Sequence, residues 1–400
     1  MSESNRNPVL NSPDDITEEL RCSIVNNNID TLTINYEFTR FRKKGEEERS
    51  WRLDQRRTNP FYGLELKHID FEIILGADVH SLAGAFAYQF ELENITIRDI
   101  SRITDLSGMF YRARKFNHPL DGWDTSGVTS LRDMFSGARA FNQPVGDWNT
   151  SKVTDMSGMF NEAESFNQPI GNWDTLRVTD MAAMFYRAKS FNQPVENWNT
   201  SSVKDMACMF GDVGAFDQSV GRWNTSKVTN MRGMFIFAGS FNRPVGNWDT
   251  SNVTDMSEMF FGAESFNQPV AGWNTSNVTE MSAMFKCARA FNQPIGEWDT
   301  AQVTDMSEMF CEAESFNQPV GDWNTSNVTT MAEMFNGAES FNQQVGDWDT
   351  SMVEDMFRMF QDAKSFNQPI DGWDTSNVTD MDDMFDGAEA YIYSLPQPAE

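Results

Sequence analysis

The chain has 400 residues and a formal net charge of −28, with 59 acidic side chains against 31 basic ones. Apolar residues make up 40% and charged residues 22%, which is the composition of a folded rather than an intrinsically disordered chain. So negative a charge argues against duplex DNA, RNA and anionic membranes as main partners, because phosphate binding needs a basic surface. There is no run of about 18 apolar residues, so membrane insertion is not expected either.

The first 78 residues lack the pattern of the rest, and residues 12–78 are predicted to form a small α+β cap. Residues 1–11 have no apolar core, so they are expected to be disordered and not to be a secretory signal. Residues 12–15 (Ser-Pro-Asp-Asp) are typical of a helix start. This helix would carry apolar residues on one face, at Ile16, Leu20 and Ile24. A strand is predicted where apolar and polar residues alternate, at Leu32, Ile34, Tyr36 and Phe38.

Beyond this cap the sequence repeats every 25 residues. The Met-Phe pair recurs twelve times, from Met109-Phe110 to Met384-Phe385. Val79, Leu82, Ala85 and Phe86 keep its spacing in a degenerate first unit. A fixed length without insertions predicts a solenoid in which each unit makes one turn, over residues 79–391, followed by a tail at 392–400. Eleven of the twelve tryptophans follow the same interval: Trp123, Trp148, Trp173, Trp198, Trp223, Trp248, Trp273, Trp298, Trp323, Trp348 and Trp373.

Within one unit the apolar spacing changes from a strand-like to a helix-like pattern. Ile170, Trp173 and Thr175 follow the spacing of leucine-rich repeats, which suits a short parallel strand. Apolar residues then recur every three or four positions, which predicts a short helix capped by Thr179, at Val178, Met181, Met184, Phe185 and Ala188. The fold expected is an α/β repeat with one short parallel strand and one short helical segment per turn, around a core of Trp, Phe and Met.

The Asn of each Phe-Asn-Gln sequence is predicted to form a buried ladder of amides that satisfies backbone groups of the turns. Asp217 replaces this Asn once. The Asn recurs at Asn117, Asn142, Asn167, Asn192, Asn242, Asn267, Asn292, Asn317, Asn342 and Asn367.

The unit Gly-Asn-Trp-Asp-Thr-Ser-Asn-Val-Thr-Asp-Met-Ser-x-Met-Phe, continued by x-x-Ala-x-Ser-Phe-Asn-Gln-Pro-Ile, resembles the mycoplasma-type 25-residue repeat domain of unknown function. That family is described as BspA-like leucine-rich-repeat surface proteins. The resemblance covers about residues 79–391. It implies a right-handed, leucine-rich-repeat-like solenoid and a role in adhesion or protein binding. Because this sequence shows no signal peptide and no lipid-attachment cysteine near its start, a place inside the cell or in a particle is expected rather than surface display.

Binding residues are predicted in the two positions that flank each Trp, because these would face solvent from the strands of a leucine-rich repeat. In the C-terminal half these positions are acidic, at Glu297, Asp299, Asp322, Asp347, Asp349 and Asp374. Such a strand-borne row would attract a basic protein partner or loosely held divalent cations. The alternative is a solvated face that only keeps the protein soluble.

A second candidate surface lies just after Met-Phe, where most units have polar or small residues. Two adjacent units have apolar residues there, at Ile236, Phe237 and Phe261. Exposed together, they would form a small docking patch, and local repacking of the turn is an equally good explanation.

No catalytic site and no cofactor are predicted. The sequence has no Gly-rich phosphate loop, nucleophile elbow or metal-binding His pair. Its cysteines are scattered and expected to be reduced, at Cys22, Cys208, Cys287 and Cys311. The hypothesis is a non-enzymatic solenoid that binds or scaffolds a protein partner through its acidic face. Two alternatives remain: a structural subunit of a larger assembly, docked through the N-terminal cap, and a cation-dependent adhesin.

Overall fold

The computed structural model describes residues 7–12, 15–26, 31–34, 61 and 64–394. Contacts divide the chain into two compact units, Met1–Gln193 and Pro194–Glu400. Among the described residues, no helix combines the length and the apolar character needed to cross a membrane.

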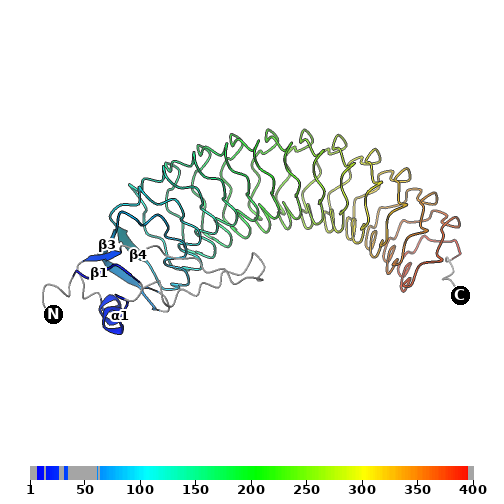
Figure 1. Ribbon diagram of the computed structural model, residues 1–400. Helices are drawn as coiled ribbons and strands as arrows, with labels where there is room; N and C mark the ends of the chain where they lie inside the picture. Colours follow the sequence, from blue (N-terminus) through cyan, green and yellow to red (C-terminus); the bar gives the residue numbers. More distant parts are fainter. Residues whose placement is uncertain (1–6, 13–14, 27–30, 35–60, 62–63, 395–400) are drawn as a thin grey trace. The chain divides into compact units, whose positions relative to one another are not determined.

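The first unit begins with a parallel sheet of four strands in the order β1-β2-β3-β4 (Figure 1). These strands are β1 (Val9–Leu10), β2 (Thr31–Ile34), β3 (His68–Leu75) and β4 (Asn94–Ile97). Helix α1 (Glu18–Val25) lies between β1 and β2 in the chain, within the crossover connection that parallel strands need. Its buried residues are Leu20 and Ile24, and the Thr17 side chain accepts a hydrogen bond from the Leu20 N–H at 3.1 Å.

Three predictions for this cap need comment. Residues 1–11 were expected to be disordered, but Val9–Leu10 pairs with β2, because Leu10 is apolar and becomes buried. The helix begins at Glu18 rather than near residues 12–15, because Thr17 supplies the cap. The predicted strand is present as β2, and its expected continuation at Tyr36 and Phe38 lies outside the described residues.

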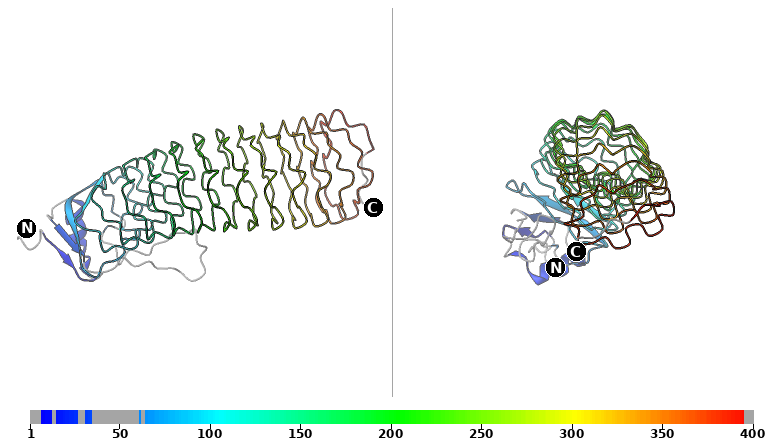
Figure 2. Two further views of the ribbon diagram at one scale, coloured as in Figure 1. Left: turned by 90° about the horizontal axis from the view of Figure 1, so that it is seen from above. Right: turned by 90° about the vertical axis from the view of Figure 1, so that its right-hand side faces the viewer.

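Stacked turns of 25 residues follow in both units, and Figure 2 shows them as separate loops lying side by side within each unit. One residue of each turn, an Asp in most turns, forms a parallel bridge to the same position of the next turn. In the first unit the bridges run from Ser81–Asp105 to Asp155–Asp180, and in the second from Asp205–Asn230 to Asp355–Asp380. The degenerate unit around Val79 therefore joins the ladder as its first turn.

The predicted helix of each turn is wrong for the described repeats: this segment is a run of β-turns. In a representative turn, the N–H groups of Met306 and Glu308 donate to carbonyls 24 residues ahead, in the next turn. The N–H groups of Met309 and Cys311 instead donate to carbonyls three residues back. Because every second donor crosses to the next turn, the four-residue bonds of an α-helix cannot form. Glu308 accordingly has a φ of 57°, as the third residue of such a turn often does.

The strand predicted at Ile170–Thr175 is also absent, and the parallel bridges lie at Asp155 and Asp180 instead. The inward direction of the side chains is nevertheless as expected, since Ile170, Trp173 and Thr175 are all buried. Burial pattern alone therefore does not distinguish a strand from an irregular segment of the same turn.

Columns of stacked aromatic rings fill the interior of each unit. Phe310 and Phe335 have ring centroids 5.5 Å apart at 9°. On the other side of the turn, the rings of Trp348 and Trp373 stack at 6.3 Å and 4°. The Trp173 indole N–H donates to the Val145 carbonyl at 3.0 Å, so a buried polar group is satisfied by the preceding turn.

The predicted amide ladder is present, but it is half-buried or exposed rather than buried, because it lies at the surface of the turns. The Asn142 Oδ1 accepts from the Asn167 N–H at 2.9 Å and from the Gln168 side-chain amide at 3.0 Å. The same pair of bonds recurs from turn to turn, for example from Asn317 and Gln318 to Asn292. Each Asn therefore joins its own turn to the next one.

Candidate binding surfaces

The six residues of the predicted acidic surface, all in the second unit, are exposed: Glu297, Asp299, Asp322, Asp347, Asp349 and Asp374. They are not borne on strands, because the segments that flank each Trp are turns and coil. In the Trp column, beside these residues, the ring centroids of Trp348 and Trp373 are 6.3 Å apart. In the column of the Met-Phe pairs, those of Phe360 and Phe385 are 5.4 Å apart. The acidic surface thus lies on the side of the turn where neighbouring turns are more widely spaced.

Local hydrogen bonds hold the carboxylates that follow the Trp residues. The Asp349 Oδ1 accepts from the Ser351 N–H at 3.0 Å and from the Ser351 hydroxyl at 2.6 Å. These bonds lower the pKa of Asp349, although the neighbouring Asp374 acts in the opposite direction. The pKa of Asp374 is lowered in the same way by bonds from Ser376. Donors within the turn therefore outweigh the repulsion between adjacent turns, and both side chains stay charged.

The predicted apolar patch of Ile236, Phe237 and Phe261 is only partly exposed. Ile236 is buried with 9% exposure and Phe261 is half-buried, whereas Phe237 is 47% exposed. The rings of Phe237 and Phe261 lie 4.6 Å apart, and Phe237 covers Gly262, where a Cβ would come within 2.5 Å of its ring. The Lys286 ammonium lies 5.5 Å from the centre of the Phe261 ring. Of the expected docking patch, therefore, only the Phe237 ring is exposed, and Ile236 and Phe261 are packed beneath or beside it.

The free cysteines Cys287 and Cys311 lie in adjacent turns of the second unit, beside acidic residues. The Cys311 sulfur lies within 4.8 Å of carboxylate oxygens of Glu308 and Glu333. Glu308 already forms an ion pair with Lys286. Burial raises the pKa of Cys311 to about 12 and that of Cys287 to about 11, so both thiols are protonated and unreactive at neutral pH.

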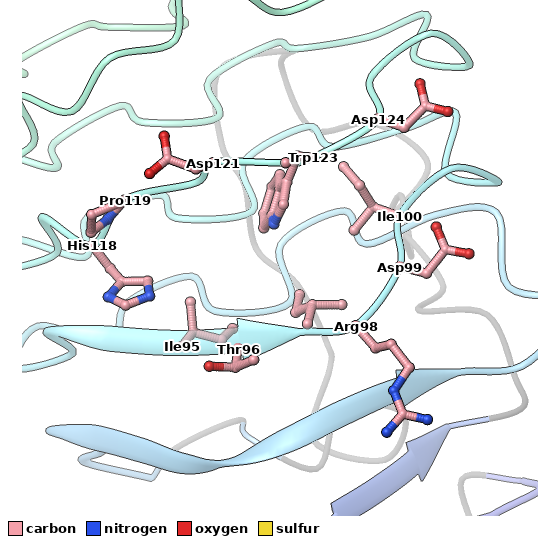
Figure 3. A pocket seen from close by; sticks show the side chains of 12 residues that line it. Ile95, Thr96, Arg98, Asp99, Ile100, His118, Pro119, Asp121, Trp123 and Asp124 are labelled. Atoms are coloured by element: carbon pink, nitrogen blue, oxygen red, sulfur yellow. The ribbon is translucent and has the colours of Figure 1, made fainter.

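A polar pocket of about 190 Å³ lies in the first unit, between β4 and the segment 118–124 (Figure 3). Figure 3 shows Asp121 and Asp124 on either side of Trp123, with His118 on the same segment and Asp99 beyond the end of β4. Trp123 is half-buried, whereas the other members of its column are buried. The sequence did not indicate this pocket, because its walls come from two separate segments of the chain, 95–100 and 118–124.

These observations define a repeat solenoid whose turns are joined by parallel bridges and side-chain ladders. The chain belongs to the family described as "Mycoplasma protein of unknown function, DUF285". The family profile matches five overlapping segments, 80–193, 167–250, 212–310, 238–330 and 293–397, which together cover most of the chain. No curated protein and no solved structure matches it.

The 25-residue period would have been enough to find the contact between Cys287 and Cys311. They are 24 residues apart, which is the spacing of the cross-turn hydrogen bonds, and the Cys287 N–H donates to the Cys311 carbonyl at 2.7 Å. Reading the cysteines as scattered overlooked that a repeat brings distant positions together.

Proposed function

We propose that this protein is a non-enzymatic binding solenoid that recognises a basic protein partner through its acidic surface. The supporting observation is that the carboxylates beside the Trp column are exposed, and that bonds from their own turns lower the pKa of Asp349 and Asp374 and so keep these two ionised. A row of fixed charges at regular spacing attracts a partner with a matching row of basic groups.

The acidic surface is a better candidate than the apolar patch, because the patch exposes mainly Phe237. Single exposed apolar residues are common on protein surfaces and do not by themselves indicate an interface. The acidic columns, by contrast, continue over several turns with the same local geometry.

The proposal is tested with Asp322→Asn, Asp347→Asn and Asp349→Asn combined. Asparagine already occupies both columns, at Asn247 before a Trp and at Asn324 after one, where its Oδ1 accepts from Ser326 as Asp349 does from Ser351. The variant therefore removes three charges and keeps the turn. Calorimetric titration with lysine- and arginine-rich peptides should give binding that weakens with salt, and the triple variant should weaken it further and flatten the salt dependence.

A matched control removes three exposed charges elsewhere in the same unit, through Glu264→Gln, Asp386→Asn and Glu389→Gln. The proposal requires that this control bind the peptides like the unmodified protein. Equal losses in both variants would mean that only the net charge attracts the peptides, and the acidic surface would then have no recognition role.

We also propose that the solenoid is right-handed and related to leucine-rich repeats of the BspA-like type. The support for the handedness is general: parallel segments joined through a crossover in one sheet are right-handed in nearly all known cases. The run of β-turns that replaces the strand and helix differs from a leucine-rich repeat. An experimental structure of the repeat would test whether the two are related.

A second candidate function is a structural subunit of a larger assembly, and the observation that favours it lies at the last turn rather than at the N-terminal cap, where docking was predicted. Phe385 and Tyr391 are half-buried, whereas the equivalent Phe360 and Phe366 are fully buried. A partner at this edge would cover them. Sedimentation at increasing concentration tests this: association abolished by Phe385→Ser would favour it, and a monomer at all concentrations would count against it.

Saturable Ca²⁺ binding at the acidic surface would instead favour the cation-dependent adhesin.

A further inference from the structure

The first Trp of the column lies in a different environment from those that follow it. Trp173 is buried between neighbouring turns and donates its indole N–H to the carbonyl 28 residues earlier. For Trp123 the equivalent residue is Ile95, in β4, and the Trp123 indole N–H makes no hydrogen bond to any described residue. Its ring stacks on Trp148 at 6.3 Å, and the pocket lies between Trp123 and β4. A half-buried donor without an acceptor therefore adjoins a cavity.

The residues around this pocket are also those at which its turn departs from the repeat. His118 stands where most later turns have the Gln that donates to the amide ladder, as Gln143 does to Asn117. Asp121 stands where most turns have Gly, as at Gly146, where a Cβ would lie 2.5 Å from the Pro169 carbonyl oxygen. The departures thus replace residues that serve the stacking of turns with polar side chains that line a cavity.

The charges around the pocket restrict the chemistry of its ligand. Asp99, Asp121 and Asp124 are among the residues that line the pocket, and so is Arg98, whose guanidinium is paired with Glu72, with 2.9 Å between Nε and Oε1. Hydrogen bonds from Ser101 and Ser126 lower the pKa of Asp99 and Asp124, so both are ionised. An anionic ligand such as phosphate is repelled by this arrangement.

A purely cationic ligand fits poorly as well. An ammonium or guanidinium group has donors only, and so cannot accept a hydrogen bond from the Trp123 indole N–H. A hydroxyl group satisfies both needs, because it accepts from the indole and donates to a carboxylate. A ligand with several hydroxyl groups and an apolar face is therefore the best match to carboxylates beside an indole ring.

From this geometry we propose that the pocket at Trp123 binds a single sugar ring of the pyranose type. The volume of about 190 Å³ is below the range of roughly 300–1,000 Å³ typical of pockets for drug-sized ligands, and suits one ring. The ring packs against Trp123, one hydroxyl oxygen accepts from its indole N–H, and other hydroxyls donate to Asp121 and Asp124. The site is separate from the acidic surface and does not depend on it.

The experiment follows the indole N–H signals of the full-length protein by NMR during titration with methyl α- and β-pyranosides of glucose, galactose, mannose and N-acetylglucosamine. The Trp123 signal is assigned by its loss in Trp123→Phe. We expect at least one glycoside to shift this signal saturably, with a dissociation constant on the order of 1 mM, as for a neutral ligand of this size. Inorganic phosphate and arginine methyl ester should leave it unchanged.

Three variants separate binding from folding. Trp123→Phe removes the donor but keeps a ring, and Asp121→Asn removes one carboxylate; each should weaken binding about tenfold, the effect of one hydrogen bond. The matched control is Trp148→Phe, since Trp148 also lacks an indole hydrogen bond to the described residues but is buried with 8% exposure. Its affinity should equal that of the unmodified protein, measured by calorimetry for all variants.

The proposal would be overturned if no pyranoside shifted the Trp123 signal saturably. It would also be overturned if Trp123→Phe and Trp148→Phe lost the same amount of affinity, or if arginine methyl ester alone bound saturably. Where a methyl glycoside binds, the matching disaccharide identifies the source of the ring. Weaker binding of the disaccharide indicates a free sugar, and equal binding indicates the terminal ring of a glycan; both results support the pocket.

Discussion

Arg243 forms a bidentate ion pair with Asp217, which precedes it by 26 residues. The distances are 2.7 Å from Nη2 to Oδ2 and 3.0 Å from Nε to Oδ1. In the neighbouring turns the same two positions have Asn and Gln, joined by neutral hydrogen bonds, as in Asn242 and Gln268. The two departures from the repeat compensate each other. The positive charge of Arg243 neutralises the negative charge of Asp217, and the link between the turns is kept.

Asp217→Asn and Arg243→Gln should each destabilise the protein, whereas the double substitution should restore the neutral ladder. A double-mutant cycle measured by urea unfolding should give a coupling energy of about 0.5–1 kcal/mol, since both side chains are partly exposed to solvent. The coupling should decrease in high salt. Strictly additive effects would show that the two positions are independent.

Trp173→Ala should cost about 3–5 kcal/mol in unfolding free energy, because it opens a cavity and removes one of the two donors to the Val145 carbonyl, which keeps only the Trp148 N–H. Hydrogen exchange should show faster exchange in the adjacent turns as well, because a repeat is stabilised by its neighbours. Trp123→Ala is the comparison: a half-buried ring with no indole bond should cost clearly less. Equal costs would place Trp123 in the same environment as Trp173 and remove the pocket.

Ser351→Ala should lower the urea midpoint at pH 7. The pKa of Asp349 is lowered, mainly by the Ser351 hydroxyl, so the folded state favours the ionised carboxylate. That stability is present above the unfolded value of 3.8 and is lost as the pH falls through the lower folded value. The difference between the variant and the unmodified protein should therefore shrink below pH 3.8.

Ala301→Ser provides the reverse control for this prediction. Ala301 occupies the position of Ser351 in another turn, and only its N–H donates to Asp299, at 3.0 Å. Adding the hydroxyl should raise the urea midpoint at pH 7. A pH-independent effect in both variants would mean that packing, not the carboxylate, is responsible.

Gly246→Ala should be destabilising by about 1–3 kcal/mol, because a Cβ there would lie 2.5 Å from the Pro269 carbonyl oxygen of the next turn. Gly272→Ala is a close control, since its Cβ would meet nothing nearer than 3.7 Å. Thermal unfolding of both variants checks the difference. Equal stability would show that the turns separate enough to accept a methyl group.

The 25-residue period by itself determined which side chains lie inside each turn. Because a solenoid superposes equivalent positions, the spacing of Trp173, Phe185 and Val178 was enough to predict their burial, and that of Asn142 and Asn167 to predict the amide ladder. The exposure of the acidic residues followed from the same reasoning, since they flank a buried Trp.

The tertiary structure decided how the backbone fills each turn and where the repeat is interrupted. Apolar residues at intervals of three or four fit a helix or a run of β-turns equally well. The choice depends on the next turn, whose carbonyls accept from Met306 and Glu308. Likewise, Trp123 keeps its place in the repeat although His118 and Asp121 depart from it, and only the neighbouring β4, in place of another Trp turn, leaves its indole beside a cavity. Both features arise from contacts between segments far apart in the chain, which local sequence patterns do not specify.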